Sequence, residues 1–195
     1  NTQINLLIKS IQNFPERGHV IGVYSLGKAQ RLIKMLRNNG WHNTIYLHGS
    51  LVKICNLYEK FGIDLGDLES ATIQDKPEKP YDFYKGKLIL APPSALADRW
   101  SRRFPDPILG MASGWMTVKQ RAKQRGINLP LILSDHADWN EILTTIKEVS
   151  PKEVWITHGA EEALIYECSK NNLTAKALSI ICLLYTSDAA DDELG

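Results

Sequence analysis

Stretches with the apolar spacing of a helix alternate along this chain with stretches that have the composition of a buried strand. Residues 4–14 carry apolar side chains at helical spacing, and residues 19–25 then form an apolar run typical of a strand. A helical pattern over residues 29–36 and a second strand over residues 44–47 follow. This alternation predicts a layered α/β architecture.

The alternation continues toward residue 178 with one interruption. Residues 51–61 fit a helix, whereas residues 62–86 are rich in Gly, Asp, Lys and Pro and predict a surface excursion with little regular structure. Buried strands are predicted over residues 87–91, 129–134 and 153–157, and helices over residues 138–149 and 160–171. Asp138, followed three residues later by Glu141, resembles a capping box at the start of a helix.

Composition limits the classes of protein that the chain can represent. Its 195 residues, 44% hydrophobic and 23% charged, suffice for one large core or two small ones. The net charge is +1, so affinity for nucleic acid requires a local patch. No apolar run approaches the roughly 20 residues that span a bilayer. Cys55, Cys168 and Cys182 lie far apart, which favours a reducing, cytoplasmic environment and argues against a thiolate zinc site.

Both ends of the sequence have features of their own. The chain begins Asn1-Thr2-Gln3 without an initiator methionine, so the natural N-terminus is expected upstream. Residues 181–195 resemble translated read-through of a sequencing adapter, and we expect them to be non-native. The alternative is a short apolar strand followed by an acidic tail.

Two histidines, His136 and His158, each follow a predicted strand. Catalytic groups and ligands gather at the carboxyl ends of strands in α/β sheets, and neighbouring parallel strands would bring both imidazoles to the same edge. Imidazole serves as a zinc ligand and as a general acid near neutral pH, and Asp135 or Asp138 could orient one ring. From spacing alone, a capping or packing role for the histidines stays open.

The segment over residues 99–125 combines positive charge with aromatic rings. It contains a single acid, Asp106, among seven basic residues and three aromatic ones: Arg99, Arg102, Arg103, Lys119, Arg121, Lys123 and Arg125, with Trp100, Phe104 and Trp115. Basic side chains supply affinity for phosphates, and aromatic faces stack on unpaired bases. The segment is a candidate nucleic-acid-binding surface. The alternative is a solvated basic helix whose aromatic side chains face the core.

Five motifs, in order, resemble those of the β-CASP nucleases in the metallo-β-lactamase superfamily. Ser134-Asp135-His136-Ala137-Asp138 is similar to motif B, and Val154-Trp155-Ile156-Thr157-His158-Gly159 is similar to motif C. Leu26-Gly27-Lys28-Ala29-Gln30-Arg31 is similar to a stretch of the inserted β-CASP domain. Ala91-Pro92-Pro93-Ser94 and Ala112-Ser113-Gly114-Trp115-Met116 resemble the bacterial branch called ligase-associated DNA exonuclease, or mRNA 3′-end processing factor-like protein.

This resemblance covers residues 18–178 and implies both a fold and an activity. The implied fold is an N-terminally truncated β-CASP domain over residues 1–129, followed over residues 130–180 by the C-terminal strands and helices of a metallo-β-lactamase αββα fold. The implied activity is zinc-dependent hydrolysis of phosphodiesters, with two metal ions in the full-length enzyme. An ATP-dependent DNA ligase and a helicase are the implied protein partners.

The resemblance also assigns roles to individual residues. His158 would be a zinc ligand, and His136, with Asp138 as a second catalytic residue, would protonate the leaving oxygen. Contacts to nucleic acid would come from basic side chains, namely Lys28, Arg99, Arg102, Arg103, Lys119 and Arg121. Around Lys28 neither GxxxxGK[ST] nor GxGxxG occurs, although the helix N-terminus at this point could hold a phosphate.

The chain departs from the family in one respect. The family's His-x-His-x-Asp-His ligand cluster precedes this region, and nothing like it occurs in residues 1–195. The resemblance therefore implies a fragment that is inactive alone. A histidine at the position of His158 is usual in RNA-processing members of the superfamily, so DNA and RNA both stay open as substrates. A non-catalytic nucleic-acid-binding module is the alternative to a nuclease.

Overall fold

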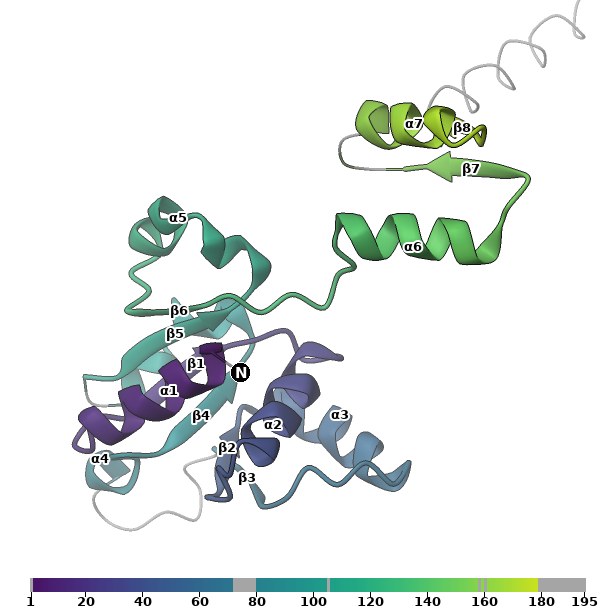
Figure 1. Cartoon of the computed structure of the whole chain (residues 1–195). Helices are drawn as coiled ribbons and strands as arrows, with labels where there is room; N and C mark the ends of the chain where they lie inside the picture. Colours follow the sequence, from purple (N-terminus) through teal and green to yellow (C-terminus); the bar gives the residue numbers. More distant parts are fainter. Residues whose placement is uncertain (1, 72–79, 105, 158, 160, 179–195) are drawn as a thin grey trace, which may run out of the picture. The chain divides into compact units, whose positions relative to one another are not determined.

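A computed structural model describes residues 2–71, 80–104, 106–157, 159 and 161–178, and the chain divides into two compact units, Asn1–Asp135 and His136–Gly195 (Figure 1). The first unit is built on six parallel strands in the order β3-β2-β4-β1-β5-β6. These strands are β1 (His19–Gly22), β2 (Ile45–Leu47), β3 (Leu68–Ser70), β4 (Leu88–Ala91), β5 (Ile108–Ala112) and β6 (Leu129–Leu131). Because all six run in the same direction, their carboxyl ends share one edge, called the carboxyl edge below.

Helices and 3₁₀ helices connect these strands, as parallel pairing requires. The helices are α1 (Thr2–Asn13), α2 (Lys28–Asn38), α3 (Gly49–Lys60), α4 (Pro80–Phe83) and α5 (Lys119–Gln124). The 3₁₀ helices are Pro93–Leu96, Ser101–Arg103 and Gly114–Thr117, and each follows the carboxyl end of β4 or β5 in the chain.

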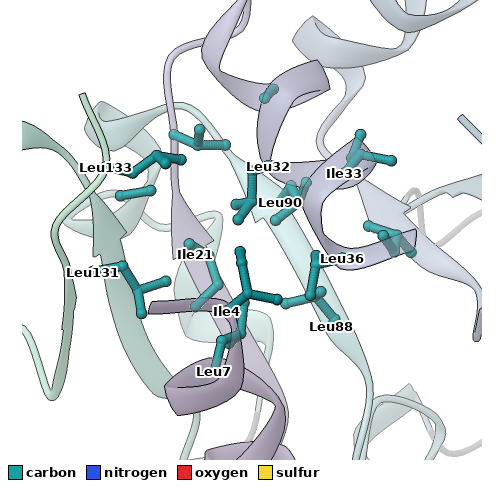
Figure 2. Packing of buried hydrophobic residues seen from close by; sticks show 14 of the residues in the cluster. Ile4, Leu7, Ile21, Leu32, Ile33, Leu36, Leu88, Leu90, Leu131 and Leu133 are labelled. Carbon is teal, nitrogen blue, oxygen red and sulfur yellow. The ribbon is translucent and has the colours of Figure 1, made fainter. Parts of the chain in front are cut away.

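Both faces of the sheet are buried. The side chains of a strand point alternately to the two faces, so neighbouring residues of one strand pack in different clusters. Leu88 and Leu90 of β4 belong to a cluster on the face covered by α1, α2 and α3 (Figure 2). Ile89, between them, faces the other side and packs in a second cluster with Tyr84 and Phe104. Figure 2 also shows Ile4, Leu7, Ile21, Leu32, Ile33, Leu36, Leu131 and Leu133 in the first cluster. Burial on both faces explains why β1, β2 and β4 were predicted from continuous apolar runs.

Two strands of the first unit were missed. Residues 62–86 were expected to have little regular structure, and the described part of this range contains only β3, which pairs with β2 at the edge of the sheet, and the short helix α4. The strand β5, which pairs with β1 and β6 inside the sheet, was not predicted at all. The predicted strand over residues 129–134 is regular only over β6.

The second unit contains α6 (Trp139–Val149), β7 (Glu153–Ile156), α7 (Glu161–Lys170) and β8 (Thr174–Ala177), with β7 and β8 paired in parallel. The helices confirm the predictions for residues 138–149 and 160–171, whereas β8 was not predicted. The expectation of a buried strand over residues 153–157 was wrong, because Trp155 is 59% exposed and only Ile156 of β7 is buried. The described part of this unit buries little apolar surface, and α6 has no buried residue.

The unit boundary lies between Asp135 and His136, because β6 is hydrogen-bonded into the six-stranded sheet. The assignment of residues 1–129 and 130–180 to two domains of the β-CASP family stays a prediction. The proposed non-native tail, residues 181–195, lies outside the described residues. Within the described ranges, no helix is both long and apolar enough to cross a membrane.

Candidate nucleic-acid interface

Two of the sequence motifs meet at the carboxyl edge of the first unit. The loop after β1 ends at Gly27, whose φ of 78° places it in the left-handed region that glycine adopts without steric cost. Lys28, the first residue of α2, has its Nζ 2.8 Å from Oδ1 of Asp135. Arg31 donates a hydrogen bond from Nη1 to the carbonyl oxygen of Ser134 at 2.7 Å. The loop that follows β6 is therefore fastened to the first turn of α2.

The position of Lys28 does not fit its predicted contact with nucleic acid. Its side chain is only 4% exposed, and the carboxylate of Asp135 neutralises its charge. A Cβ added to Gly27 would lie 4.0 Å from Oδ2 of Asp135, so this carboxylate lies against the N-terminal end of α2. An anion is favourable at that end of a helix, but a second anion, such as a phosphate, would be repelled by the carboxylate. The arrangement assigns Lys28 a structural role.

Gln30, from the same motif, also has a structural role. Its side chain is buried and donates hydrogen bonds from Nε2 to the carbonyl oxygen of Ser25 at 2.9 Å and to Sγ of Cys55 at 3.3 Å. These bonds hold the loop after β1 against α3. Burial raises the pKa of Cys55, which keeps the thiol protonated and unreactive.

The predicted catalytic residues lie at the start of the second unit. Asp138 is the N-cap of α6: its Oδ1 accepts a hydrogen bond from the backbone N–H of Glu141, and its own N–H donates to Oε2 of Glu141, both at 2.8 Å. The predicted capping box is therefore confirmed. His136 is exposed, two residues before this cap. The catalytic roles of His136 and Asp138 stay predictions.

His158 lies outside the described residues, so its role as a zinc ligand also stays a prediction. The strands that precede the two histidines, β6 and β7, belong to different sheets. The expectation that these two strands are neighbours in one sheet was therefore wrong. Its basis was the similar position of the two histidines after apolar runs, which says nothing about which strands pair.

Zinc requires three protein ligands in a catalytic site and four in a structural site. Among the residues that the structure describes, no three His, Cys, Asp or Glu side chains gather where they could hold a metal ion. The described donor set does not fit a complete zinc site, so no catalytic step through the metal can be derived from it.

The first group of predicted nucleic-acid contacts follows β4. Arg99, Arg102 and Arg103 line a depression of about 770 Å³ together with Asp98 and Trp100. Arg103 donates a hydrogen bond from Nε to the carbonyl oxygen of Trp100 at 2.9 Å, and its guanidinium carbon lies 5.2 Å from the centroid of the Trp100 ring. Arg99 and Arg102 are exposed and can reach a phosphate, whereas Arg103 is half-buried against the tryptophan.

The ring of Trp100 also contacts His48, with 4.7 Å between the centroids, and Phe104, with 4.9 Å. Burial, together with the nearby guanidinium of Arg103, lowers the pKa of His48. Phe104 is 2% exposed and belongs to the core. The alternative given in the sequence analysis, an aromatic side chain that faces the core, is therefore correct for Phe104. Its ring cannot stack on nucleic-acid bases.

The second group of predicted contacts follows β5. Lys119 and Arg121 are exposed on α5, and the guanidinium carbon of Arg121 lies 4.1 Å from the centroid of the Trp115 ring. Trp115 is 62% exposed, and its backbone N–H donates to Oγ of Ser113 at 3.3 Å. Trp115 thus differs from Trp100 and Phe104 in presenting most of its surface to solvent.

One comparison with known proteins matches part of the second unit, and two others match most of the chain. Residues 130–170 match the family described as Zn-dependent metallo-hydrolase RNA specificity domain. A protein from Opitutus terrae named as a probable DNA ligase is 27% identical over 157 residues, which make up 80% of this chain and 14% of that protein. A crystal structure of a protein of unknown function from Enterococcus faecalis V583 is 15% identical, with a TM-score of 0.47, and the match covers 78% of this chain and 38% of that one.

The family match and the relative confirm the predicted resemblance to the metallo-β-lactamase/β-CASP class, and the structure has the predicted α/β fold. It spans only a small part of the relative's length. The metallo-hydrolase family and the ligase-named relative fit a nucleic-acid hydrolase in general.

Proposed function

We propose that this chain contributes to a metal-dependent nuclease that hydrolyses phosphodiester bonds of DNA as an exonuclease. The observation that carries the proposal is the match of residues 130–170, which include His136 and Asp138, to a Zn-dependent metallo-hydrolase domain. Two features of the first unit support it. The segment that leads to His136 is fastened to α2, and the exposed side chains of Arg99, Arg102, Lys119 and Arg121 lie on segments that follow the carboxyl ends of β4 and β5.

In this proposal His136 is the general acid. Cleavage of a phosphodiester leaves an alkoxide that is a poor leaving group until it gains a proton, and a protonated imidazole donates one near neutral pH. Asp138 holds the start of α6 through its capping box, two residues beyond His136. Zinc, as two ions, is the proposed cofactor. His158 and residues outside the described ranges would have to complete its ligand set.

A second candidate function is processing of RNA 3′ ends. The matched family is described as an RNA specificity domain, and this wording favours RNA over DNA. The relative named as a probable DNA ligase favours DNA and a link to ligation. An ATP-dependent DNA ligase and a helicase stay proposed partners in ligase-associated repair.

The test is cleavage of labelled single-stranded DNA and RNA by the full-length gene product, with its zinc content measured. His136→Ala should lower kcat by roughly 100- to 10,000-fold, as expected for loss of a general acid, with little change in affinity. Preferred cleavage of RNA would favour the second candidate. A metal-free product that binds nucleic acid without cleaving it would contradict both nuclease proposals and indicate a binding module.

A further inference from the structure

We propose that Tyr24 and Trp115 form a stacking site for unpaired bases, so that the chain binds nucleic acid in single-stranded form. This inference rests on the proposed function and names the form of its substrate. It begins from the placement of the two rings. Strands β1 and β5 are neighbours in the sheet, with Gly22 opposite Met111. Tyr24 lies in the loop that follows β1, and Trp115 lies in the 3₁₀ helix Gly114–Thr117 that follows β5, so both come after the carboxyl ends of these strands.

Both rings are exposed to solvent. Tyr24 is 54% exposed and Trp115 is 62% exposed, although each lies within three residues of a strand buried on both faces. A single exposed aromatic ring is ordinary on a protein surface, whereas here two exposed rings follow neighbouring strands at one edge of the sheet.

A basic side chain lies against each ring. Nζ of Lys28 is 5.1 Å from the centroid of the Tyr24 ring, and the guanidinium carbon of Arg121 is 4.1 Å from the centroid of the Trp115 ring. A cation against an aromatic face fixes the ring in place, and the exposed Arg121 also attracts phosphates. Because Lys28 is buried and paired with Asp135, it serves only to hold the Tyr24 ring, whereas an exposed arginine beside an exposed ring, as at Trp115, is a combination that single-stranded nucleic-acid-binding proteins use.

The two rings also lie beside the segment that leads to His136. A Cβ added to Gly114, which precedes Trp115, would lie 3.4 Å from Cβ of Ser134, so the loop after β5 lies directly against the loop after β6. Lys28, behind Tyr24, is paired with Asp135 in that same segment. A strand of nucleic acid stacked on these rings would therefore be held next to the residues that precede the proposed general acid.

Stacking on such rings discriminates against duplexes. In a double helix each base is already stacked between its neighbours, so its faces are not accessible to Tyr24 or Trp115. An unpaired base exposes both faces and gains the stacking energy without prior unstacking. The surface therefore selects single strands over duplexes with little preference among bases.

The experiment measures the affinity of the complete 195-residue chain for a short oligothymidylate and for a duplex of equal length, by fluorescence anisotropy at fixed salt. Tyr24→Ala and Trp115→Ala should each weaken binding of the single strand by about tenfold or more, and Trp115→Phe should retain most of the affinity. Binding of the duplex should not change. Phe61→Ala is the matched control, because Phe61 is 78% exposed but follows α3 at the far end of that helix from the carboxyl edge.

Salt dependence separates stacking from charge. Lys119→Ala should reduce the slope of log affinity against log salt by about 0.7, the value for one phosphate contact on a single strand, while Trp115→Ala should leave the slope unchanged. If neither Tyr24→Ala nor Trp115→Ala changes the affinity for the single strand, the proposal is overturned, and the rings would be assigned to a protein contact. Equal losses for single strand and duplex would also overturn it. An inactive gene product whose affinity for single strands depends on both rings would contradict the nuclease while supporting this site.

Discussion

The ammonium of Lys28 lies 2.8 Å from the carboxylate of Asp135, and the two partners differ sharply in burial: the lysine side chain is 4% exposed and the aspartate side chain is 34% exposed. The pair joins two motifs more than 100 residues apart in the sequence. From the sequence, Lys28 resembled a phosphate-binding residue. In the structure, its ion pair with Asp135 positions the segment before His136 instead.

The difference in burial predicts that the two partners are not equally important for stability. Asp135→Ala leaves a buried ammonium without its counter-ion and should lower the free energy of unfolding by about 3 kcal/mol. Lys28→Met leaves a carboxylate that water can reach and should lower it by about 1 kcal/mol. Urea denaturation of both variants and of the double variant would measure this. The free energy of unfolding lost in the double variant should be smaller than the sum of the losses in the two single variants, because the partners interact directly.

Lys53→Met is the control for this comparison, since Lys53 is an exposed lysine of α3 and its replacement should change stability little. Equal losses in Lys28→Met and Asp135→Ala would contradict the asymmetry, because they would show that the carboxylate is as poorly solvated as the ammonium.

A second prediction concerns the dependence of stability on pH. His19 is fully buried at the start of β1, with Nε2 2.9 Å from Oγ of Ser10, and burial lowers its pKa from 6.5 to about 4. Between these values the unfolded chain binds a proton that the folded chain does not bind. The contribution of His19 to stability is therefore complete above pH 6.5 and is lost as the pH falls toward 4. At about 1.4 kcal/mol per pKa unit, the loss is about 3 kcal/mol.

Urea denaturation across this pH window measures the effect. His19→Gln should remove this part of the pH dependence, whereas His42→Gln, at an exposed histidine, should retain it. A wild-type chain whose free energy of unfolding is flat between pH 6.5 and 4 would show that His19 takes up its proton in the folded state without penalty.

The fold was predictable from sequence where burial on two faces produces continuous apolar runs, as in β1 and β4. The edge strand β3 was missed because Leu68-Glu69-Ser70 has no such run: only Leu68 packs against the core, and Glu69 and Ser70 are exposed. The strand β5 was missed because it lies in a basic segment and contains Gly110. That glycine is not a turn signal: a Cβ at this position would lie 2.4 Å from Cδ1 of Ile21, so a larger residue would require the Ile21 side chain to move.

The candidate site was less predictable, because burial of its residues depends on partners distant in sequence. The motif residues Lys28 and Gln30 resemble surface residues until Asp135 and Cys55 are in place. The capping box at Asp138 was predictable because its two members are three residues apart and interact within one turn.

A third prediction separates helix capping from catalysis at Asp138. Asparagine is as good an N-cap as aspartate, whereas alanine cannot accept the hydrogen bond from Glu141. Asp138→Asn should therefore retain stability, and Asp138→Ala should lose about 1 kcal/mol by thermal or urea denaturation. In the full-length gene product, unchanged cleavage by Asp138→Asn would exclude a catalytic role for the carboxylate, and a large loss of kcat would support one.

The two aromatic side chains Phe104 and Trp115 come from the same basic segment, and a last prediction contrasts them. Phe104 is 2% exposed, and its ring centroid lies 4.8 Å from that of Tyr84 and 4.9 Å from that of Trp100. Phe104→Ala should lower the free energy of unfolding by about 3–5 kcal/mol, because it removes a ring from the middle of a packed cluster. Trp115→Ala removes a largely solvated ring and should change stability by no more than about 0.5 kcal/mol.

Urea denaturation of both variants, beside the affinity of each for oligothymidylate, tests the contrast directly. The measurement on Phe104→Ala belongs at low temperature, where enough folded chain remains to be assayed. We expect its folded fraction to retain affinity, since Phe104 is not accessible to bases, whereas Trp115→Ala retains stability and loses affinity. A large loss of stability in Trp115→Ala would show that its ring is packed against other parts of the protein, and Trp115 could then not serve as a stacking surface.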